Sequence, residues 1–139
     1  MKCSTVTPRI INRLAAKHGV DLNAVGAQLR LSMSNDHQLV IERTTARQIT
    51  VTHLVNQEGN WITRSEFEFF TGYGDPEHRG QALWIPIAMQ GQRVAELNGD
   101  GTHIECAQVE AQATAADQAN DWARSLFGEN WLEYSIALS

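Results

Sequence analysis

The chain has 139 residues, 42% of them hydrophobic and 19% charged, and a formal net charge of −5 at pH 7. This length and composition are those of one folded globular domain, so we expect a single domain over residues 1–139. The sequence lacks the roughly 18 to 20 consecutive apolar residues of a membrane span and lacks a signal-peptide core near its start, which favours a cytoplasmic location without a membrane partner.

The first predicted element is an amphipathic helix over about residues 8–18. Thr7 followed by Pro8 is typical of a helix start, because a threonine oxygen caps free amides and proline at the first helical position has no amide to leave unpaired. Gly19 is the predicted end of the helix. Apolar residues at helical spacing form one face, and the other face carries a basic stripe of Arg9, Arg13 and Lys17.

From Gln28 onward the apolar residues alternate with a period of two, which predicts strands over about residues 28–109. The expected strands cover residues 28–34, 38–43, 48–55, 61–70, 81–89, 92–97 and 102–109. A bend is expected near Arg64 and Ser65. Pro86 cannot donate to a strand ladder, so it indicates an edge strand or a bulge.

The last predicted helix covers about residues 115–127. Thr114 and Asp117 resemble the two ends of a capping box, and Gly128 favours a left-handed helix stop. Residues 130–138 are apolar enough to pack on the body, but their pattern assigns neither helix nor strand. These elements predict an α+β fold: an antiparallel meander of about six to seven strands with an amphipathic helix at each end of the chain.

No motif in the sequence indicates catalysis, a cofactor or a metal ion. The GxSxG, GxxxxGK[ST], HExxH and GxGxxG patterns are absent. His103 and Cys106 are spaced like one half of a zinc site, but no second pair of ligands accompanies them. His53 lies among alternating apolar residues, so we interpret it as a core histidine bound by a neighbouring carbonyl or carboxylate. We therefore expect a protein that is not an enzyme.

The candidate partner-binding residues lie in the glycine-rich segment 71–80 and on the strand before it. Three glycines and a proline disfavour regular structure in this segment, and functional residues are often placed on such loops. The predicted contacts are Tyr73, Asp75, Glu77 and Arg79, together with Glu66 and Glu68. The same pattern also fits an ordinary exposed loop and the polar outer face of a strand.

Charge is distributed unevenly along the chain. Residues 1–47 hold seven Lys and Arg against three Asp and Glu, whereas residues 48–139 hold four against thirteen. Proteins bind nucleic-acid phosphates through cationic side chains, so the acidic part disfavours direct nucleic-acid binding. A basic protein surface is the better match, because complementary charge speeds association.

Short motifs within about residues 29–89 carry a resemblance to a known family. They are His53 with Leu54, residues 58–60, residues 64–66, and Trp84 with Pro86. This part of the chain resembles a family of small uncharacterised domains carried on plasmids, integrative elements and phages. That family has no assigned activity, so the resemblance implies no catalytic residue.

In size, acidity and lack of enzyme motifs, the chain is also similar to the anti-CRISPR proteins of bacterial mobile elements. This similarity implies a non-enzymatic protein-interaction module that binds basic surfaces of a host protein or nucleoprotein defence complex. Two alternatives remain open at this point. One is an accessory factor for plasmid transfer or maintenance, and the other is a small enzyme with a site near the 71–80 loop.

Overall fold

A seven-stranded antiparallel sheet forms the centre of the computed structural model, which describes residues 1–71 and 83–138. The strands follow the order β6-β5-β4-β3-β2-β1-β9, so each strand from β1 to β6 lies beside the next one in the chain. The α+β meander predicted from the alternating pattern is therefore confirmed. The strands are β1 (Gln28–Met33), β2 (His37–Thr45), β3 (Gln48–Gln57), β4 (Asn60–Phe70), β5 (Ile85–Met89), β6 (Gln92–Arg93) and β9 (Ile136–Ala137).

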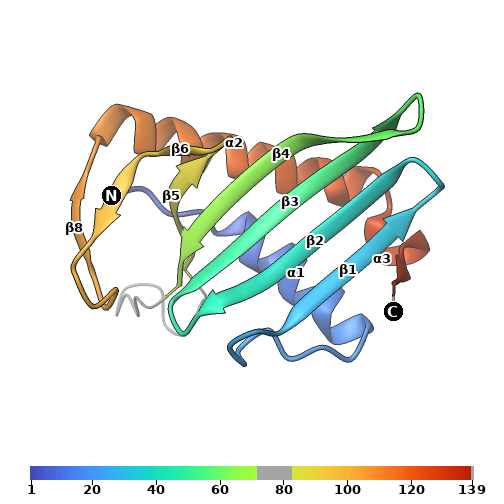
Figure 1. Ribbon diagram of the computed structural model, residues 1–139, viewed down its shortest axis with the longest axis horizontal. Helices are drawn as coiled ribbons and strands as arrows, with labels where there is room; N and C mark the ends of the chain where they lie inside the picture. The colour runs from blue at the N-terminus through green and yellow to red at the C-terminus, as the bar shows by residue number, and fades with distance from the viewer. Residues whose placement is uncertain (72–82, 139) are drawn as a thin grey trace.

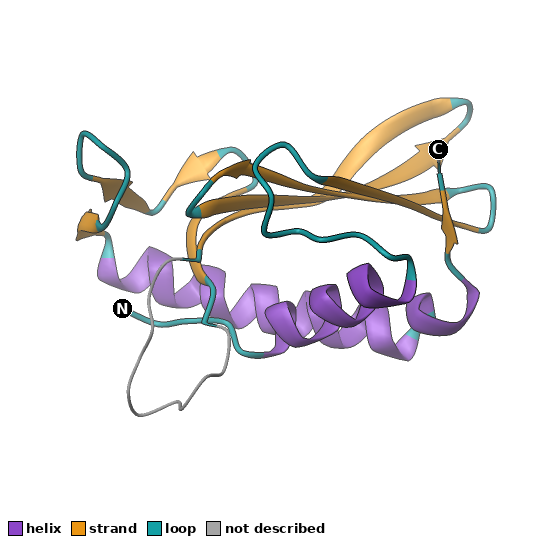
Figure 2. Ribbon diagram, turned by 90° about the horizontal axis from the view of Figure 1, so that it is seen from below, coloured by secondary structure: helices purple, strands orange, loops and turns teal. Residues whose placement is uncertain are grey.

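Both long helices, α1 (Val6–Lys17) and α2 (Val109–Gly128), cover the same face of this sheet. Figures 1 and 2 show them side by side in one layer, and none of the helices of residues 1–71 and 83–138 lies on the opposite face. We call the opposite face the open face. The core between the layers holds Ile11 and Leu14 of α1, Leu126 of α2, and Leu31, Ile41, Ile49 and Phe69 of the sheet.

The start of α1 differs from its prediction. The helix begins at Val6, so Thr7 lies inside the first turn and is not the capping residue. The Thr7 hydroxyl instead donates to the Ala119 carbonyl of α2 at 3.1 Å, and the Ser4 hydroxyl accepts from the Thr7 amide at 3.2 Å. The predicted end is confirmed, because Gly19 follows the helix with a φ of +71°.

The second helix begins at Val109, six residues before the predicted start at about residue 115. Thr114 and Asp117 therefore lie within the helix and do not form a capping box. Buried Gln112 explains the earlier start: its amide donates to the Lys2 carbonyl at 2.6 Å and to the Pro86 carbonyl at 3.3 Å, and accepts from the Lys2 amide at 2.9 Å. These tertiary contacts hold the first turn of the helix, and no capping motif marks them in the sequence.

Replacing Gln112 with alanine is expected to lower the free energy of unfolding by about 1 to 3 kcal/mol, because buried polar groups would lose their partners. Urea denaturation followed by circular dichroism measures the change. Gln118→Ala is the matched control, since Gln118 is exposed on the same helix. Equal losses in the two variants would contradict the role given to Gln112.

The predicted strand over residues 92–97 is divided in the structure. The chain leaves the main sheet at Val94, whose amide donates to the Ile87 carbonyl at 2.8 Å. Beyond it, β7 (Ala95–Leu97) and β8 (Ile104–Ala107) form a separate two-stranded sheet, so the last predicted strand does not join the meander. This hairpin encloses a second, smaller apolar cluster of Phe70, Ile85, Ile87, Ala95 and Ile104.

The C-terminal residues form a one-turn helix, α3 (Trp131–Tyr134), followed by β9 at the edge of the sheet. Trp131 is fully buried against the core. The Lys17 ammonium donates to the Leu132 carbonyl and, at 3.1 Å, to the Glu133 carbonyl. The Leu138 amide donates to the Arg30 carbonyl at 2.8 Å. Among the helices described here, none has the length and apolarity needed to cross a membrane.

Candidate functional site

The turn between β3 and β4 ends the longest hairpin of the sheet. Glu58 and Gly59 both have a positive φ, of 53° and 86°, as a two-residue turn between twisted strands requires. Figure 2 shows the end of this hairpin curving away from the helix layer. Trp61 and Ile62 follow the turn directly and are 43% and 45% exposed.

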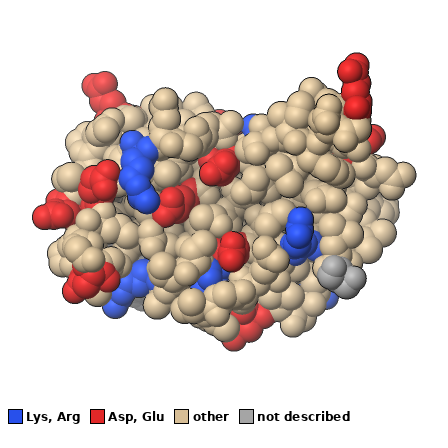
Figure 3. Space-filling view, viewed as in Figure 1, with Lys and Arg blue, Asp and Glu red and all other residues tan. Residues whose placement is uncertain are grey.

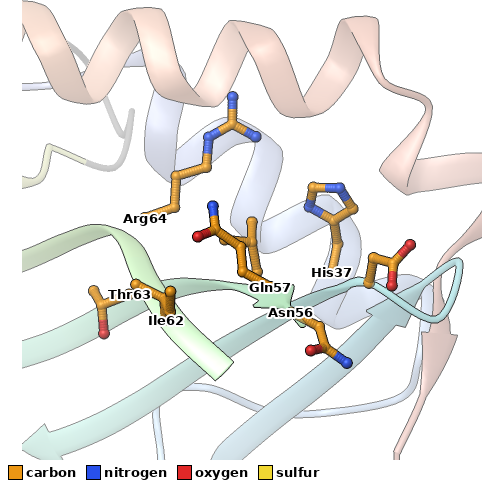
Figure 4. Close-up of a pocket in the computed structure, with 8 residues that line it drawn as sticks. His37, Asn56, Gln57, Ile62, Thr63 and Arg64 are labelled. Atoms are coloured by element: carbon orange, nitrogen blue, oxygen red, sulfur yellow. The ribbon is translucent and has the colours of Figure 1, made fainter. Parts of the chain in front are cut away.

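A β-bulge in β4 places Arg64 near the end of the same hairpin. His53 pairs with Ser65 and Leu54 pairs with Thr63, which leaves Arg64 as an extra residue without a partner position on β3. A bulge bends its strand and redirects a side chain. This register shift is the bend predicted near Arg64 and Ser65. Figure 4 shows the Arg64 side chain extending toward the helix layer, on the same side of the sheet as His37.

An open pocket of about 460 Å³ lies between this hairpin and the turn that joins β1 to β2. We call it the hairpin-end pocket. Its lining residues are Asp36, His37, Val55, Asn56, Gln57, Ile62, Thr63 and Arg64. The backbone amide of Asn56 donates to the Asp36 carbonyl at 2.8 Å, which links the β3–β4 hairpin to the turn between β1 and β2.

A chain of hydrogen bonds leads from the core to this pocket. The Trp122 indole donates from Nε1 to His53 Nδ1 at 3.3 Å. An indole only donates, so neutral His53 carries its proton on Nε2, which lies 3.3 Å from His37 Nδ1. His53 therefore donates to His37, and the proton of neutral His37 is placed on its remaining nitrogen, Nε2.

The expectation for His53 is thus half right. The residue is 2% exposed and belongs to the core, but its partners are an indole and a second imidazole instead of a carbonyl or carboxylate. The pKa of His53 is lowered to about 4; burial is the largest cause, the charges of Arg64 and His37 act in the same direction, and Glu129 acts in the opposite direction. His53 is consequently neutral at pH 7.

The surroundings of His53 suit a positioning role. Both ring nitrogens are occupied, and within residues 1–71 and 83–138 no hydroxyl or thiol side chain forms a hydrogen bond with the ring. A pKa of about 4 also makes the ring a weak base at neutral pH. The hydrogen bonds of His53 fix the orientation and the tautomer of the His37 ring.

The structure places two of the six predicted partner-binding residues. Glu66 and Glu68 lie on the open face; Glu66 is exposed, whereas Glu68 accepts from the Gln48 amide at 2.9 Å and lies 3.8 Å from Arg93. Figure 3 shows acidic and basic side chains interspersed on this face, with broad uncharged areas between them. The other four, Tyr73, Asp75, Glu77 and Arg79, lie outside the described residues.

His37, Trp61 and Arg64 are the site residues that sequence reasoning did not single out as partner contacts. The signals for them are indirect. An exposed tryptophan beside a hairpin turn is one such signal. The other is strand register: Leu39 pairs with His53 and His37 pairs with Val55, so the two histidines are diagonal neighbours on one face.

Metal-ligand geometry gives no further candidate. In the part of the chain that the structure describes, no three His, Cys, Asp or Glu side chains gather closely enough to hold a metal ion. Comparison with protein-family models, curated proteins and solved structures finds no match to this chain.

Proposed function

We propose that the chain is a non-enzymatic protein-interaction module that docks onto a partner through the end of the β3–β4 hairpin. The observation that carries this proposal is the exposure of Trp61 and Ile62 at the end of this hairpin, where Ile62 also lines the hairpin-end pocket. A large exposed aromatic side chain is a common anchor of a protein interface, because its burial contributes much of the binding free energy.

The chemistry of the pocket agrees with binding more than with catalysis. Both ring nitrogens of His53 form hydrogen bonds, one with Trp122 and one with His37, and its low pKa keeps the ring neutral at pH 7. Arg64 and His37 present hydrogen-bond donors to the pocket, and Val55 and Ile62 present apolar surface. Donors and apolar walls together provide recognition.

The partner class follows from charge and from the resemblance described above. A net charge of −5 favours a partner with a basic surface, and it makes association sensitive to salt. In its most specific form, the proposal is an anti-CRISPR-like inhibitor, encoded by a mobile element, that binds a host nucleoprotein defence complex. The open-face carboxylates Glu66 and Glu68 and the 71–80 segment are the proposed acidic contacts.

Replacing Trp61 with alanine is expected to weaken partner binding by about 30-fold or more, the effect of losing a central aromatic anchor. Affinity capture from host lysate at low and high salt identifies the partner, and calorimetry with the purified partner measures the change. Val25→Ala is the control, because Val25 is also an exposed apolar residue, 64% exposed, but lies in the segment before β1.

Three results separate the possibilities. Recovery of a nucleoprotein defence complex, with weaker binding by Trp61→Ala alone, supports the proposal. Recovery of relaxosome or replication proteins favours the accessory role in plasmid transfer or maintenance. Equal binding by both variants would remove the hairpin end as the docking surface.

A further inference from the structure

We infer that the hairpin-end pocket binds a carboxylate group, held between the Arg64 guanidinium and the Nε2–H of His37. The inference does not depend on the proposed protein partner, since the pocket would bind free acids even if the hairpin end docked on no protein. It assigns a ligand class to a cavity in which sequence reasoning expected no binding site.

The direction of the hydrogen-bond chain determines what His37 offers a ligand. The Trp122 indole can only donate, so His53 accepts at Nδ1 and donates from Nε2 to His37 Nδ1, which leaves neutral His37 with an N–H on Nε2. Buried His53 is fixed by packing against Trp131, with the rings edge to face and their centroids 5.6 Å apart. His37 therefore presents a donor of fixed orientation, and such a donor selects a ligand that accepts hydrogen bonds.

The Arg64 guanidinium faces the same space as His37. The bulge brings its side chain to the same side of the sheet as His37, and its charge acts on the neighbouring His53. Within the described ranges its guanidinium forms no ion pair and no side-chain hydrogen bond. A guanidinium offers two parallel N–H groups that match the two oxygens of a carboxylate.

The charge of the pocket lining bears on the charge of its ligand. Among the lining residues that the structure describes, Arg64 is the one arginine or lysine and Asp36 the one aspartate or glutamate. These two charges balance, so a bound monoanion adds one negative charge, whereas a phosphate dianion adds two to a chain that already carries −5. The pocket charge favours a carboxylate over a phosphate.

Apolar surface lies beside these donors. Val55 and Ile62 line the same pocket, and Ile62 is 45% exposed. A ligand with a short apolar body next to its carboxylate would cover both side chains and gain free energy from their burial. Two sources share this chemistry: a free branched-chain or aromatic monocarboxylic acid, and the terminal carboxylate of a peptide that ends in an apolar residue.

The test is a titration of isotope-labelled protein at pH 7.5 with 4-methylpentanoate, followed by NMR at the His37 ring and the Arg64 Nε–H. Saturable shifts at both groups are expected, and the neutral isostere 4-methylpentanamide should produce neither. Arg64→Gln is expected to weaken binding by about tenfold or more, the usual loss for a charge-assisted pair. Arg30→Gln, at an exposed arginine of β1, should leave the affinity unchanged.

A second arm distinguishes the two sources. A short peptide ending in leucine and its C-terminal amide are titrated in the same way; tighter binding of the peptide acid than of 4-methylpentanoate assigns the pocket to a protein terminus, and the reverse assigns it to a free acid. Equal shifts with acid and amide, equal affinities in the two arginine variants, or tighter binding of inorganic phosphate would each overturn the inference. These outcomes are independent of whether Trp61→Ala affects partner capture.

Discussion

Replacing Trp131 with alanine is expected to lower the free energy of unfolding by about 3 to 5 kcal/mol. Trp131 is among the largest fully buried side chains, and it packs its ring against His53 at a centroid distance of 5.6 Å. Its indole also donates to Glu129 at 3.2 Å. Alanine would leave a cavity beneath the sheet and release α3, which has only four residues of its own.

Urea denaturation of the wild type and of Trp131→Ala measures this loss. Trp131→Phe serves as the matched control, because phenylalanine fills most of the volume and lacks only the indole donor, so its loss should be clearly smaller. A domain of this size has a total stability of about 5 to 15 kcal/mol, so the loss is a large fraction of the total. A loss below about 1 kcal/mol would show that the tail is not part of the core.

Acidification is expected to remove about 3 kcal/mol of stability through His53 alone. The folded pKa of about 4 lies below the unfolded value of 6.5, so between these two values the unfolded chain binds a proton that the folded chain does not. Stability therefore rises with pH across this window. The contribution is fully present above pH 6.5 and is lost as the pH falls toward 4.

Comparing the pH dependence of unfolding in the wild type and in His53→Gln isolates this contribution. Glutamine can still accept from the Trp122 indole but does not titrate, so the variant should lose less stability than the wild type between pH 7.5 and 4.5. His103→Gln is the control at an exposed histidine and should follow the wild type. Parallel curves for the wild type and His53→Gln would show that His53 takes up its proton over the same pH range in the folded and unfolded states, which would contradict a lowered pKa.

The elements that the sequence predicts well are those that depend on neighbouring residues. Alternation fixes which face of β3 is buried, and helical spacing fixes the buried face of α1 through Ile11 and Leu14. Both signals reflect burial of one side of an element, which a single period expresses. The two-residue turns follow from local backbone needs in the same way, as Gly59 illustrates.

The elements that it predicts poorly depend on residues far away in the chain. The early start of α2 depends on the hydrogen bonds from Gln112 to the Lys2 and Pro86 carbonyls. The position of the C-terminal segment depends on the burial of Trp131 and on the hydrogen bond from Lys17 to the Glu133 carbonyl. No local pattern encodes these contacts. Tertiary packing overrides the weak capping signal at Thr114 for the same reason.

The candidate site shows both behaviours. Alternation alone places His53 in the core, and the bend at Arg64 is visible as a break in the pattern of β4. The partner of His53 is different, because His37 lies next to a turn and carries no periodic signal. It meets His53 only through the register of β2 against β3, which depends on the whole hairpin.

The packing of α1 against α2 affects how the chain can fold while it is being synthesised. The Thr7 hydroxyl donates to the Ala119 carbonyl, and the Ser4 hydroxyl donates to the Asn120 side chain. These partners are synthesised more than a hundred residues after α1, so α1 cannot make its contacts with α2 until then. The six strands from β1 to β6 leave the exit tunnel before α2 does, so the apolar surface that α2 covers in the folded protein is still exposed at that stage. Nascent chains at this stage are the form of the protein most in need of a chaperone.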